Sequence, residues 1–326
     1  MKLYAVGGRQ KREALDLEEW HRYEAAIVAT VDSERGHAAV ALEFQSAPEI
    51  RPDDGGSVLF KAATRQGERL YACTQTEVVV YRLPTFEQLA HISLARFNDV
   101  HHVRPREDGS LLVVSTGLDC VLHLSAAGDL IREWPVLQVG DAPVWDAGID
   151  YRKLATTKPH RAHPNYAFEL DGRIWATRFE QRDAVCVEHL QHRIPIDIER
   201  PHDGVVHERE IYFTTVDGNV VVADAASRAV VRRFDLNAIA RHGIPLGWCR
   251  GIHVLARDQV LVGFSRIRRT RFKDNLRWVV SRARGRDPRS LPTRIAQFDL
   301  ARGVLLREWS LEEAGVNAVF SIHPAD

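Results

Sequence analysis

The segment REIYFTTVDGNVVVADAASRAVVRRFDL, residues 209–236, contains three short, mostly apolar runs separated by polar sequences that include DG and ASR. Val, Ile, Tyr, Phe and Thr are typical of β-strands, whereas Gly, Asp and Ser are typical of turns. The segment therefore predicts three consecutive antiparallel strands joined by tight turns. The same pattern recurs along the chain, and in two copies an insertion interrupts it. The further copies cover residues 2–44, 68–94, 110–136, 172–197 and 258–311.

An additional strand-like run precedes the copies and raises the count to four strands per repeat. Examples are FNDVHHV from Phe97, HPNYAFE from His163 and, more weakly, SVLFKA from Ser57. The N-terminal copy lacks such a leading run. A run without a copy of its own, VNAVFSIHP at residues 316–324, follows the final copy. The end of the chain therefore supplies the strand that the beginning lacks.

A ring of four-stranded sheets that is closed by one C-terminal strand is a β-propeller, which leaves only short strand edges. The sequence predicts an all-β, six-bladed β-propeller with four antiparallel strands per blade, as a single domain over residues 1–326. A pair of large β-sandwiches is the alternative. The expected blades are residues 316–324 with 2–44, then 56–94, 97–136, 162–198, 201–236 and 249–311.

These repeats resemble the six-bladed propellers of the NHL and SMP-30/gluconolactonase-like superfamily, and the resemblance extends over nearly the whole chain. It rests on the repeat pattern of segments such as residues 110–136 and 209–236, since no single diagnostic motif is present. Lactonases and phosphotriesterases of that superfamily bind Ca²⁺ through carboxylate and amide oxygens. The resemblance therefore implies a cation site in the channel and, as one expected function, a Ca-dependent lactonase or esterase.

The composition is that of a soluble globular protein without a global charge bias. Lys plus Arg and Asp plus Glu both number 44, so neither nucleic acid nor an anionic membrane is an expected partner. The 4 cysteines form no CxxC pair, which argues against a disulfide framework or a thiolate zinc site. The sequence shows no signal-peptide core and no apolar stretch long enough to span a membrane, so a cytoplasmic location is expected.

The predicted connections between strands differ in length according to the face on which they lie. In an antiparallel blade, the turns after the first and third strands lie on one face, and the remaining connections lie on the other. The turns of the first kind are all short. The long connections, all of the second kind, are residues 8–24, 45–56, 137–162, 237–248 and 266–293. Insertions confined to one face of a repeat protein mark its binding face, so we expect the site there.

Histidine is concentrated on the expected innermost strands, which line the channel. These strands contain His101, His102, His163, His202, His207, His253 and His323. Neutral imidazole is a common ligand of iron, copper and zinc. We predict a divalent transition metal bound by His163, His202, His253 and either His101 or His102, because adjacent strand residues face opposite ways. Calcium, held by oxygen ligands near the mouth, is the less favoured alternative.

Polar residues near the expected mouth supply further candidates. Arg250 is expected to hold an anionic substrate, whereas Lys158 and His160 are expected to gate the site or donate protons. The alternative for each of these residues alone is an ordinary packing or surface role. The candidate substrate pocket consists of Asn98, Asp99, Asn165, Asp203, Tyr166 and Trp145, with Tyr151 as a further wall residue and Asn317 as a further oxygen ligand.

The insertion at residues 266–293 is strongly basic, and its apolar residues recur at helical spacing. It predicts an amphipathic helix that covers the channel mouth or contacts an acidic protein partner. Contact with RNA or an anionic membrane is a weaker alternative.

The sequence favours a metal-dependent enzyme that acts on a small, anionic substrate through Lewis-acid or redox chemistry. The alternative is a non-catalytic scaffold that binds a protein or peptide on the same face. No GxGxxG, Walker A, HExxH or GxSxG motif is present to support other chemistries.

Overall fold

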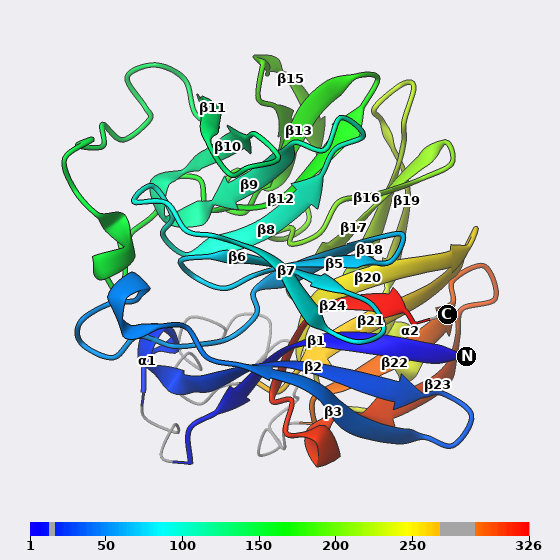
Figure 1. Ribbon diagram of the computed structural model, residues 1–326. Coiled ribbons are helices and arrows are strands. Elements are labelled where there is room, and N and C mark those ends of the chain that lie inside the picture. Colours follow the sequence, from blue (N-terminus) through cyan, green and yellow to red (C-terminus); the bar gives the residue numbers. More distant parts are fainter. Residues whose placement is uncertain (13–16, 268–290, 326) are drawn as a thin grey trace.

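The computed structural model describes residues 1–12, 17–267 and 291–325, and it confirms an all-β, six-bladed propeller. Each blade is a four-stranded antiparallel sheet, and the blades surround a common axis (Figure 1). Most of the insertion at residues 266–293, including its predicted amphipathic helix, lies outside the described residues.

Apart from β24, which comes from the end of the chain, the strands of the first three blades follow one another in sequence. The first contains β24 (Ala318–Pro324), β1 (Lys2–Gln10), β2 (Tyr23–Asp32) and β3 (His37–Phe44). The second contains β4 (Ala62–Gln66), β5 (Arg69–Cys73), β6 (Val78–Arg82) and β7 (Glu87–Ile92). The third contains β8 (Val100–Pro105), β9 (Leu111–Ser115), β10 (Cys120–Leu124) and β11 (Leu130–Pro135).

The other three blades complete the ring. The fourth contains β12 (Pro164–Leu170), β13 (Arg173–Arg178), β14 (Asp183–Cys186) and β15 (His189–Pro195). The fifth contains β16 (Val205–His207), β17 (Glu210–Thr215), β18 (Asn219–Asp224) and β19 (Val230–Asp235). The sixth contains β20 (Trp248–Ala256), β21 (Gln259–Ser265), β22 (Arg294–Asp299) and β23 (Val304–Ser310).

Helical segments in the described part of the chain are short and lie in connections between strands. The α-helices are α1 (Glu19–Arg22) and α2 (Leu236–Ala240). The 3₁₀ turns are η2 (Pro48–Ile50), η3 (Thr116–Leu118), η4 (Tyr151–Lys153) and η6 (Glu312–Ala314). None of the helices in the described ranges is long and apolar enough to cross a membrane.

The innermost strands form a closed ring. In order around the axis, β24 contacts β4, β4 contacts β8, β8 contacts β12, β12 contacts β16, β16 contacts β20, and β20 contacts β24. The apolar cores lie between neighbouring blades, because each sheet turns one face to the next. Phe168 of the fourth blade and Phe213 of the fifth, for example, meet edge to face with ring centroids 6.1 Å apart.

The ring closes in the first blade, where β24 pairs antiparallel with β1 from Leu3 opposite Pro324 to Gly8 opposite Ala318. The two termini therefore lie side by side (Figure 1). The strands approach so closely that a Cβ at Gly7 would lie 1.8 Å from the carbonyl oxygen of Ala318. Only glycine fits at this position without a shift of the backbone.

The strand expected from Ser57 begins five residues later, at Ala62. The amides of Val58 and Phe60 donate instead to the carbonyls of Tyr23 and Gly7 in the first blade. Residues 57–61 are thus tied to the neighbouring blade before their own begins. This connection carries Lys61 to the channel.

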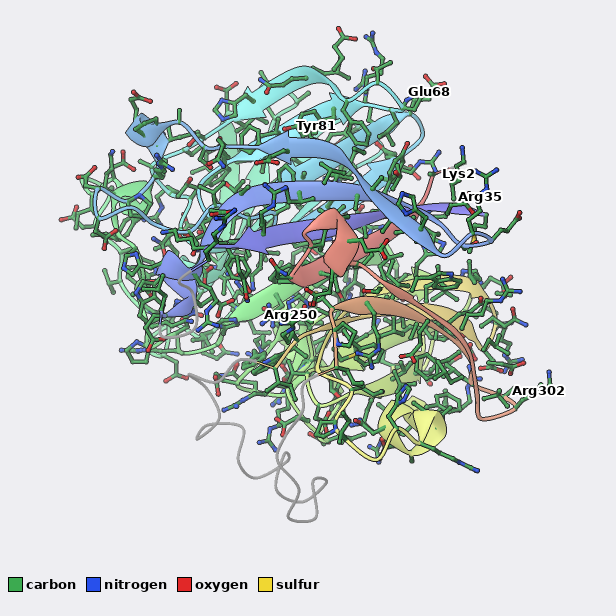
Figure 2. All side chains as sticks on the ribbon, turned by 90° about the horizontal axis from the view of Figure 1, so that it is seen from below. Lys2, Arg35, Glu68, Tyr81, Arg250 and Arg302 are labelled. Carbon is green, nitrogen blue, oxygen red and sulfur yellow. The ribbon has the colours of Figure 1, made fainter. Side chains whose placement is uncertain are left out.

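The long connections lie on one face, as predicted for the part of the chain that the structure describes. Lys153 of η4 reaches Asp53 at 2.9 Å, and Lys158 lies over the ring of Trp20 in α1. The short turns occupy the opposite face, where Arg35, Glu68 and Arg302 lie along one side of the molecule (right in Figure 2). All 4 cysteines are buried and unpaired, in agreement with the sequence.

Candidate functional site

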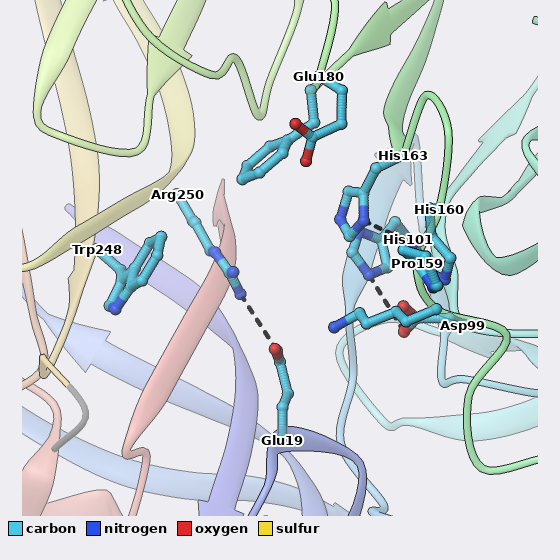
Figure 3. A pocket seen from close by; sticks show the side chains of 11 residues that line it. Glu19, Asp99, His101, Pro159, His160, His163, Glu180, Trp248 and Arg250 are labelled. Atoms are coloured by element: carbon cyan, nitrogen blue, oxygen red, sulfur yellow. Dashed lines mark hydrogen bonds and ion pairs between the residues drawn. The ribbon is translucent and has the colours of Figure 1, made fainter. Parts of the chain in front are cut away.

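A pocket of about 440 Å³ opens at the channel mouth on the face of the long loops (Figure 3). Residues of three long connections, 8–24, 137–162 and 237–248, line it. Glu19 comes from α1, and Lys158 and His160 come from the loop before β12. Arg250 and Trp248 come from the start of β20. The pocket thus joins segments that are more than 200 residues apart in sequence.

A buried ionic cluster lies at one side of this pocket. Lys61, whose side chain is only 2% exposed, places Nζ 2.9 Å from Oδ1 of Asp99 and 3.6 Å from Oε1 of Glu19. The same Asp99 oxygen is 3.2 Å from Nε2 of His101. The Asp99 backbone has φ +48°, in the left-handed region that a non-glycine residue seldom adopts. Such conformations often accompany functional sites.

The tautomer of His101 follows from its neighbours. Asn165 donates from Nδ2 to the carbonyl of Pro201, so its Oδ1 is the atom that faces His101. That oxygen can only accept, and it lies 2.7 Å from Nδ1 of His101. The neutral ring carries one proton, and the Asn165 contact is shorter than the 3.2 Å contact between Nε2 and Asp99, so we place the proton on Nδ1. Nε2 then carries the lone pair, 3.4 Å from the Lys61 ammonium, which can donate to it. His101 presents a base nitrogen beside Asp99.

Asp119 holds the loop that carries His163. Its buried carboxylate accepts from the backbone amides of Arg161, Ala162 and His163, at 2.7 to 3.1 Å. The His163 backbone also lies in the left-handed region, at φ +54°. Three hydrogen bonds to a charged acceptor fix this turn and, with it, the direction of the His163 side chain.

His160 and His163 form a second imidazole pair, with their Nδ1 atoms 2.8 Å apart. Nε2 of His160 is buried and has no hydrogen-bond partner in the described part of the chain. A lone pair in that position costs less than an unsatisfied N–H. We therefore place the shared proton on Nδ1 of His160, which leaves His163 with an N–H at Nε2. The rings of His163 and His101 meet edge to face, with centroids 5.0 Å apart.

Arg250 lies across the pocket from the imidazoles (Figure 3). Its guanidinium packs over the rings of Phe320, 4.7 Å from the centroid, and Trp248, at 5.6 Å. Glu19 is 3.9 Å from Nη1, which is a long ion pair. Stacking between aromatic rings orients an arginine while its N–H groups still reach an anion.

His202 lies deeper along the axis. Its side chain is 3% exposed, and neither ring nitrogen has a hydrogen-bond partner among the described residues. The nearest carboxylate oxygen, Oδ1 of Asp203, is 3.5 Å from Nδ1. The centroid of the ring is 6.2 Å from that of His101.

Burial keeps these imidazoles uncharged at neutral pH. It lowers the pKa of His101 to about 4, although Asp99 opposes the shift. Burial also lowers the pKa values of His160, His163 and His202, and that of His163 falls well below the usual range. Burial alone would raise the pKa of Asp99, but Lys61 and His101 hold it well below the usual range, so Asp99 is ionised.

The structure does not bring together the four predicted metal ligands. His253 lies in a different cavity, toward the opposite end of the channel, together with His323. Among the described residues, no group of three His, Cys, Asp or Glu side chains converges closely enough to hold a metal ion. The strand positions already place His253 deeper than His163, which immediately precedes β12, whereas His253 lies well inside β20.

Both His101 and His102 reach the inner ring, contrary to the prediction that only one would do so. The register of β8 against β9 shifts between Val100 and His102, as in a β-bulge. His102 accepts from the amide of Ala167, approaches Thr64 Oγ1 at 3.3 Å and stacks on Tyr166. A bulge breaks the alternation on which the prediction depended.

The remaining predicted pocket residues divide into two groups. Asp99 lines the mouth pocket, and Asn165 orients His101 from beneath it. The others support the fold or lie elsewhere. Asn98 donates to the carbonyls of Tyr151 and Leu154, and Trp145 donates to that of Leu118. Asp203 accepts from the Thr214 hydroxyl and the Gly251 amide, Asn317 accepts from the amide of Gln10, and Tyr166 lines the opposite cavity.

Sequence reasoning missed Lys61, Glu19 and Asp119. Lys61 offered a signal, because it is the single charge in the apolar run SVLFKAA. A lysine in a strand-like apolar run is either at a solvated edge or buried with a partner. Glu19 and Asp119 stand in a charged loop and a turn, where acidic residues are ordinary.

The fold and this pocket define the protein as a six-bladed β-propeller with a polar cavity at one mouth of its channel. Neither a protein-family model nor a curated protein matches the sequence. The fold is similar to that of a protein of unknown function from Bacteroides caccae, at 12% identity and a TM-score of 0.61, covering 98% of this chain and 97% of that one. A chain in the crystal structure of a nidogen/laminin complex is similar at 9% identity and a TM-score of 0.56, covering 98% and 97%.

At these identities the likeness shows the propeller fold alone. Membership of the NHL and SMP-30-like superfamily stays a prediction.

Proposed function

We propose that the protein is an enzyme that binds a small organic anion in the mouth pocket and moves a proton on it by means of neutral imidazoles. One observation carries the proposal: His101, His160 and His163 occupy one wall of the pocket, and the Arg250 guanidinium faces them from the other (Figure 3). An anion-binding group opposite a cluster of uncharged bases is suited to positioning an acid for proton transfer.

Arg250 is the proposed anion anchor. A guanidinium binds a carboxylate or phosphate through two parallel hydrogen bonds, and the Phe320 and Trp248 rings limit its orientation. Glu19, at 3.9 Å, is near enough to orient the guanidinium and distant enough for a substrate to compete. Lys158 supplies a second positive charge on the pocket wall.

His101 is the proposed base, since its Nε2 carries the lone pair in the tautomer that Asn165 imposes. In the proposed step, this nitrogen takes a proton from a carbon next to a carbonyl, and the electron pair of the broken C–H bond moves to the carbonyl oxygen. The Asp99 carboxylate beside Nε2 compensates the positive charge that develops on the ring, whereas the Lys61 ammonium opposes that charge. Return of the proton to the same carbon restores the substrate or its mirror image.

His163 is the proposed electrophile. With its proton on Nε2, the neutral ring donates a hydrogen bond to the oxygen that becomes negative, as neutral imidazoles do in other proton-transferring enzymes. The His160 partner at Nδ1 holds this tautomer. Together these roles favour a small 2-oxo acid or a related acid with a carbonyl beside a C–H bond.

The test is exchange of carbon-bound hydrogen with solvent. Pyruvate and 2-oxobutanoate are incubated with the full chain in D₂O, and loss of the C–H signal next to the carbonyl is followed by proton NMR. We expect exchange above the buffer rate, reduced by roughly 10²- to 10⁴-fold in His101→Asn. Asparagine keeps a donor for Asn165 and removes only the base nitrogen. His189→Asn, at an exposed position of β15, is the matched control.

Binding measurements distinguish the proposed role of Arg250 from that of His101. Arg250→Lys should weaken binding of both acids and change the exchange rate at saturation less than His101→Asn does. Exchange that is equal in the wild-type protein and His101→Asn contradicts the proposal.

Metal analysis distinguishes this function from the metal-dependent enzyme that the sequence favours. His202 is the observation that favours a metal centre, because both nitrogens of its buried ring lack a hydrogen-bond partner in the described ranges. Stoichiometric iron, copper or zinc that disappears in His202→Ala supports the metal centre. Metal-free protein that still exchanges the substrate hydrogen supports the imidazole mechanism.

A further inference from the structure

A cavity of about 520 Å³ lies between the second and third blades. Strands β5, β6 and β7 of the second blade line one side, and β9 with the turns at Gly109 and Ala126 of the third blade lines the other. Neither innermost strand of these blades, β4 or β8, contributes to the lining, so the cavity is separate from the channel. Glu68, one of the lining residues, lies on the face of the short turns (Figure 2).

The wall of this cavity is largely apolar. Val80, Ile92 and Leu111 line it and are at most 7% exposed, as part of the core cluster between the two blades. Leu89 of β7 lines it too and packs against the same cluster while half-buried. A ligand with an apolar part would therefore remove apolar surface from water by binding here.

Two arginines line the cavity from neighbouring strands. Arg69 of β5 is directly opposite Arg82 of β6 in the register of this antiparallel pair. The next pair on the same face of the sheet is Tyr71 opposite Val80, and both belong to the core shared with the third blade. Like charges at directly opposite positions destabilise a sheet, and an anion bound between them removes the repulsion.

The acids around the two arginines leave Arg69 without an ionic partner among the described residues. Glu87 pairs with Arg82 at 2.6 Å, and both of these side chains are more than half exposed. Glu68 lines the cavity but forms no ion pair with either arginine in the described part of the chain. Asp108, in the facing turn, has hydrogen-bond partners within its own turn.

Tyr71 adds a hydrogen-bond donor to the same wall. It is 8% exposed and lines the cavity, and its hydroxyl has no hydrogen-bond partner among residues 1–12, 17–267 and 291–325. A tyrosine hydroxyl that is buried to this degree usually has a partner. Because Tyr71 is the next residue after Arg69 on the same face of β5, one ligand group can contact both side chains.

We propose that this cavity binds a small amphipathic carboxylate, such as a medium-chain fatty acid. Its carboxylate lies between Arg69 and Arg82 and accepts from the Tyr71 hydroxyl. Its apolar chain lies along Leu89 and Ile92. Guanidinium groups bind carboxylates through paired hydrogen bonds, and the volume is in the range of small-molecule sites. The site does not depend on the function proposed for the mouth pocket.

Isothermal titration of the full chain with hexanoate, acetate and 1-hexanol at neutral pH tests the site. Hexanoate combines the charge of acetate with the chain of 1-hexanol, so it should bind at least about tenfold more tightly than either. Arg69→Gln should weaken hexanoate binding at least about tenfold, and Tyr71→Phe should weaken it several-fold. Glu68→Gln should strengthen binding, because it removes a carboxylate that repels the ligand.

Arg302→Gln is the matched control, because Arg302 is also exposed on the face of the short turns, but in the sixth blade (Figure 2). It should leave the affinity unchanged. Methyl signals of Leu89 and Ile92 should shift in NMR spectra on addition of hexanoate, and those of Ile322, in the opposite cavity, should not.

Three outcomes would overturn the proposal. In the first, wild-type protein does not bind hexanoate at about 10 mM, or binds it no better than 1-hexanol. In the second, Arg69→Gln and Arg302→Gln bind hexanoate equally well. In the third, binding is lost in Arg250→Lys and kept in Arg69→Gln, which would place the ligand in the mouth pocket instead.

Discussion

At the scale of single residues, Lys61 shows how one buried charge joins three parts of the chain. Its ammonium contacts Asp99 at the start of the third blade, Glu19 of α1 and His101 of β8. Burying an ion pair is costly, and its net contribution to stability is small when both partners are present. Removing one partner leaves the other charge buried without compensation.

Lys61→Met should therefore lower the free energy of unfolding by about 3–5 kcal/mol, because Asp99 loses its closest cation. The double variant Lys61→Met with Asp99→Asn should lose less than the sum of the two single changes. Urea unfolding followed by fluorescence measures both.

Lys153→Met is the matched control for this prediction. Lys153 pairs with Asp53 at the same 2.9 Å distance, but Asp53 is 80% exposed. An exposed pair contributes about 0–1 kcal/mol. If Lys61→Met costs no more than Lys153→Met, the buried cluster does not have the role assigned to it.

At the scale of elements, the strands were predictable and their fine geometry was not. Runs such as residues 219–224 alternate or concentrate β-branched residues and are bounded by turn residues, which identifies a strand from local information alone. The closing strand β24 was predictable because it was left over from the repeat count.

The candidate site was only partly predictable, for two physical reasons. The bulge in β8 inserts a residue that changes which way His101 and His102 face, and no local signal marks it. The depth of a ring along the axis depends on how each blade is shifted against the next, which placed His253 far from His163. The loop residues Lys158 and His160 were found because a long loop on one face must cover the mouth.

Gly7→Ala tests the closure of the ring at the level of the β1–β24 pair. The added methyl group would meet the Ala318 carbonyl at 1.8 Å, so the strands must separate. We expect a loss of at least about 1–3 kcal/mol in the free energy of unfolding, as for overpacking elsewhere.

Gly148→Ala provides the comparison for this change, since its nearest described neighbour would be Asp146 Oδ1 at 3.3 Å and its backbone is not left-handed. Thermal unfolding of the two variants should differ clearly. Equal midpoints would mean that the tight contact between β1 and β24 does not limit stability.

At the scale of the whole molecule, the histidines on the axis make stability depend on pH. Burial lowers the pKa of His101 and of His323 to about 4, and it lowers those of His102 and His163 well below the usual 6.5. The unfolded chain therefore takes up protons between pH 6.5 and 4 that the folded chain does not.

The folded chain therefore keeps its full free energy of unfolding above pH 6.5. This free energy decreases as the pH falls toward 4, because protons then bind the unfolded chain in preference. Each such histidine contributes a slope of about 1.4 kcal/mol per pH unit within that window. Urea midpoints measured from pH 7.5 to 4.5 should fall steeply. His323→Gln keeps a donor for Ala63 and should reduce the slope by about one proton, whereas an unchanged slope would contradict the assignment.

The position of β24 in the chain order also constrains biosynthesis. Every other strand of the ring is translated before residues 318–324, so the nascent chain holds five complete blades and a first blade in which β1 still lacks its partner. During that interval the backbone N–H and C=O groups of β1 that later pair with β24 are exposed, and they can pair with a strand of another chain. Slow translation or premature termination ahead of residue 318 is therefore expected to produce aggregates rather than a shortened propeller.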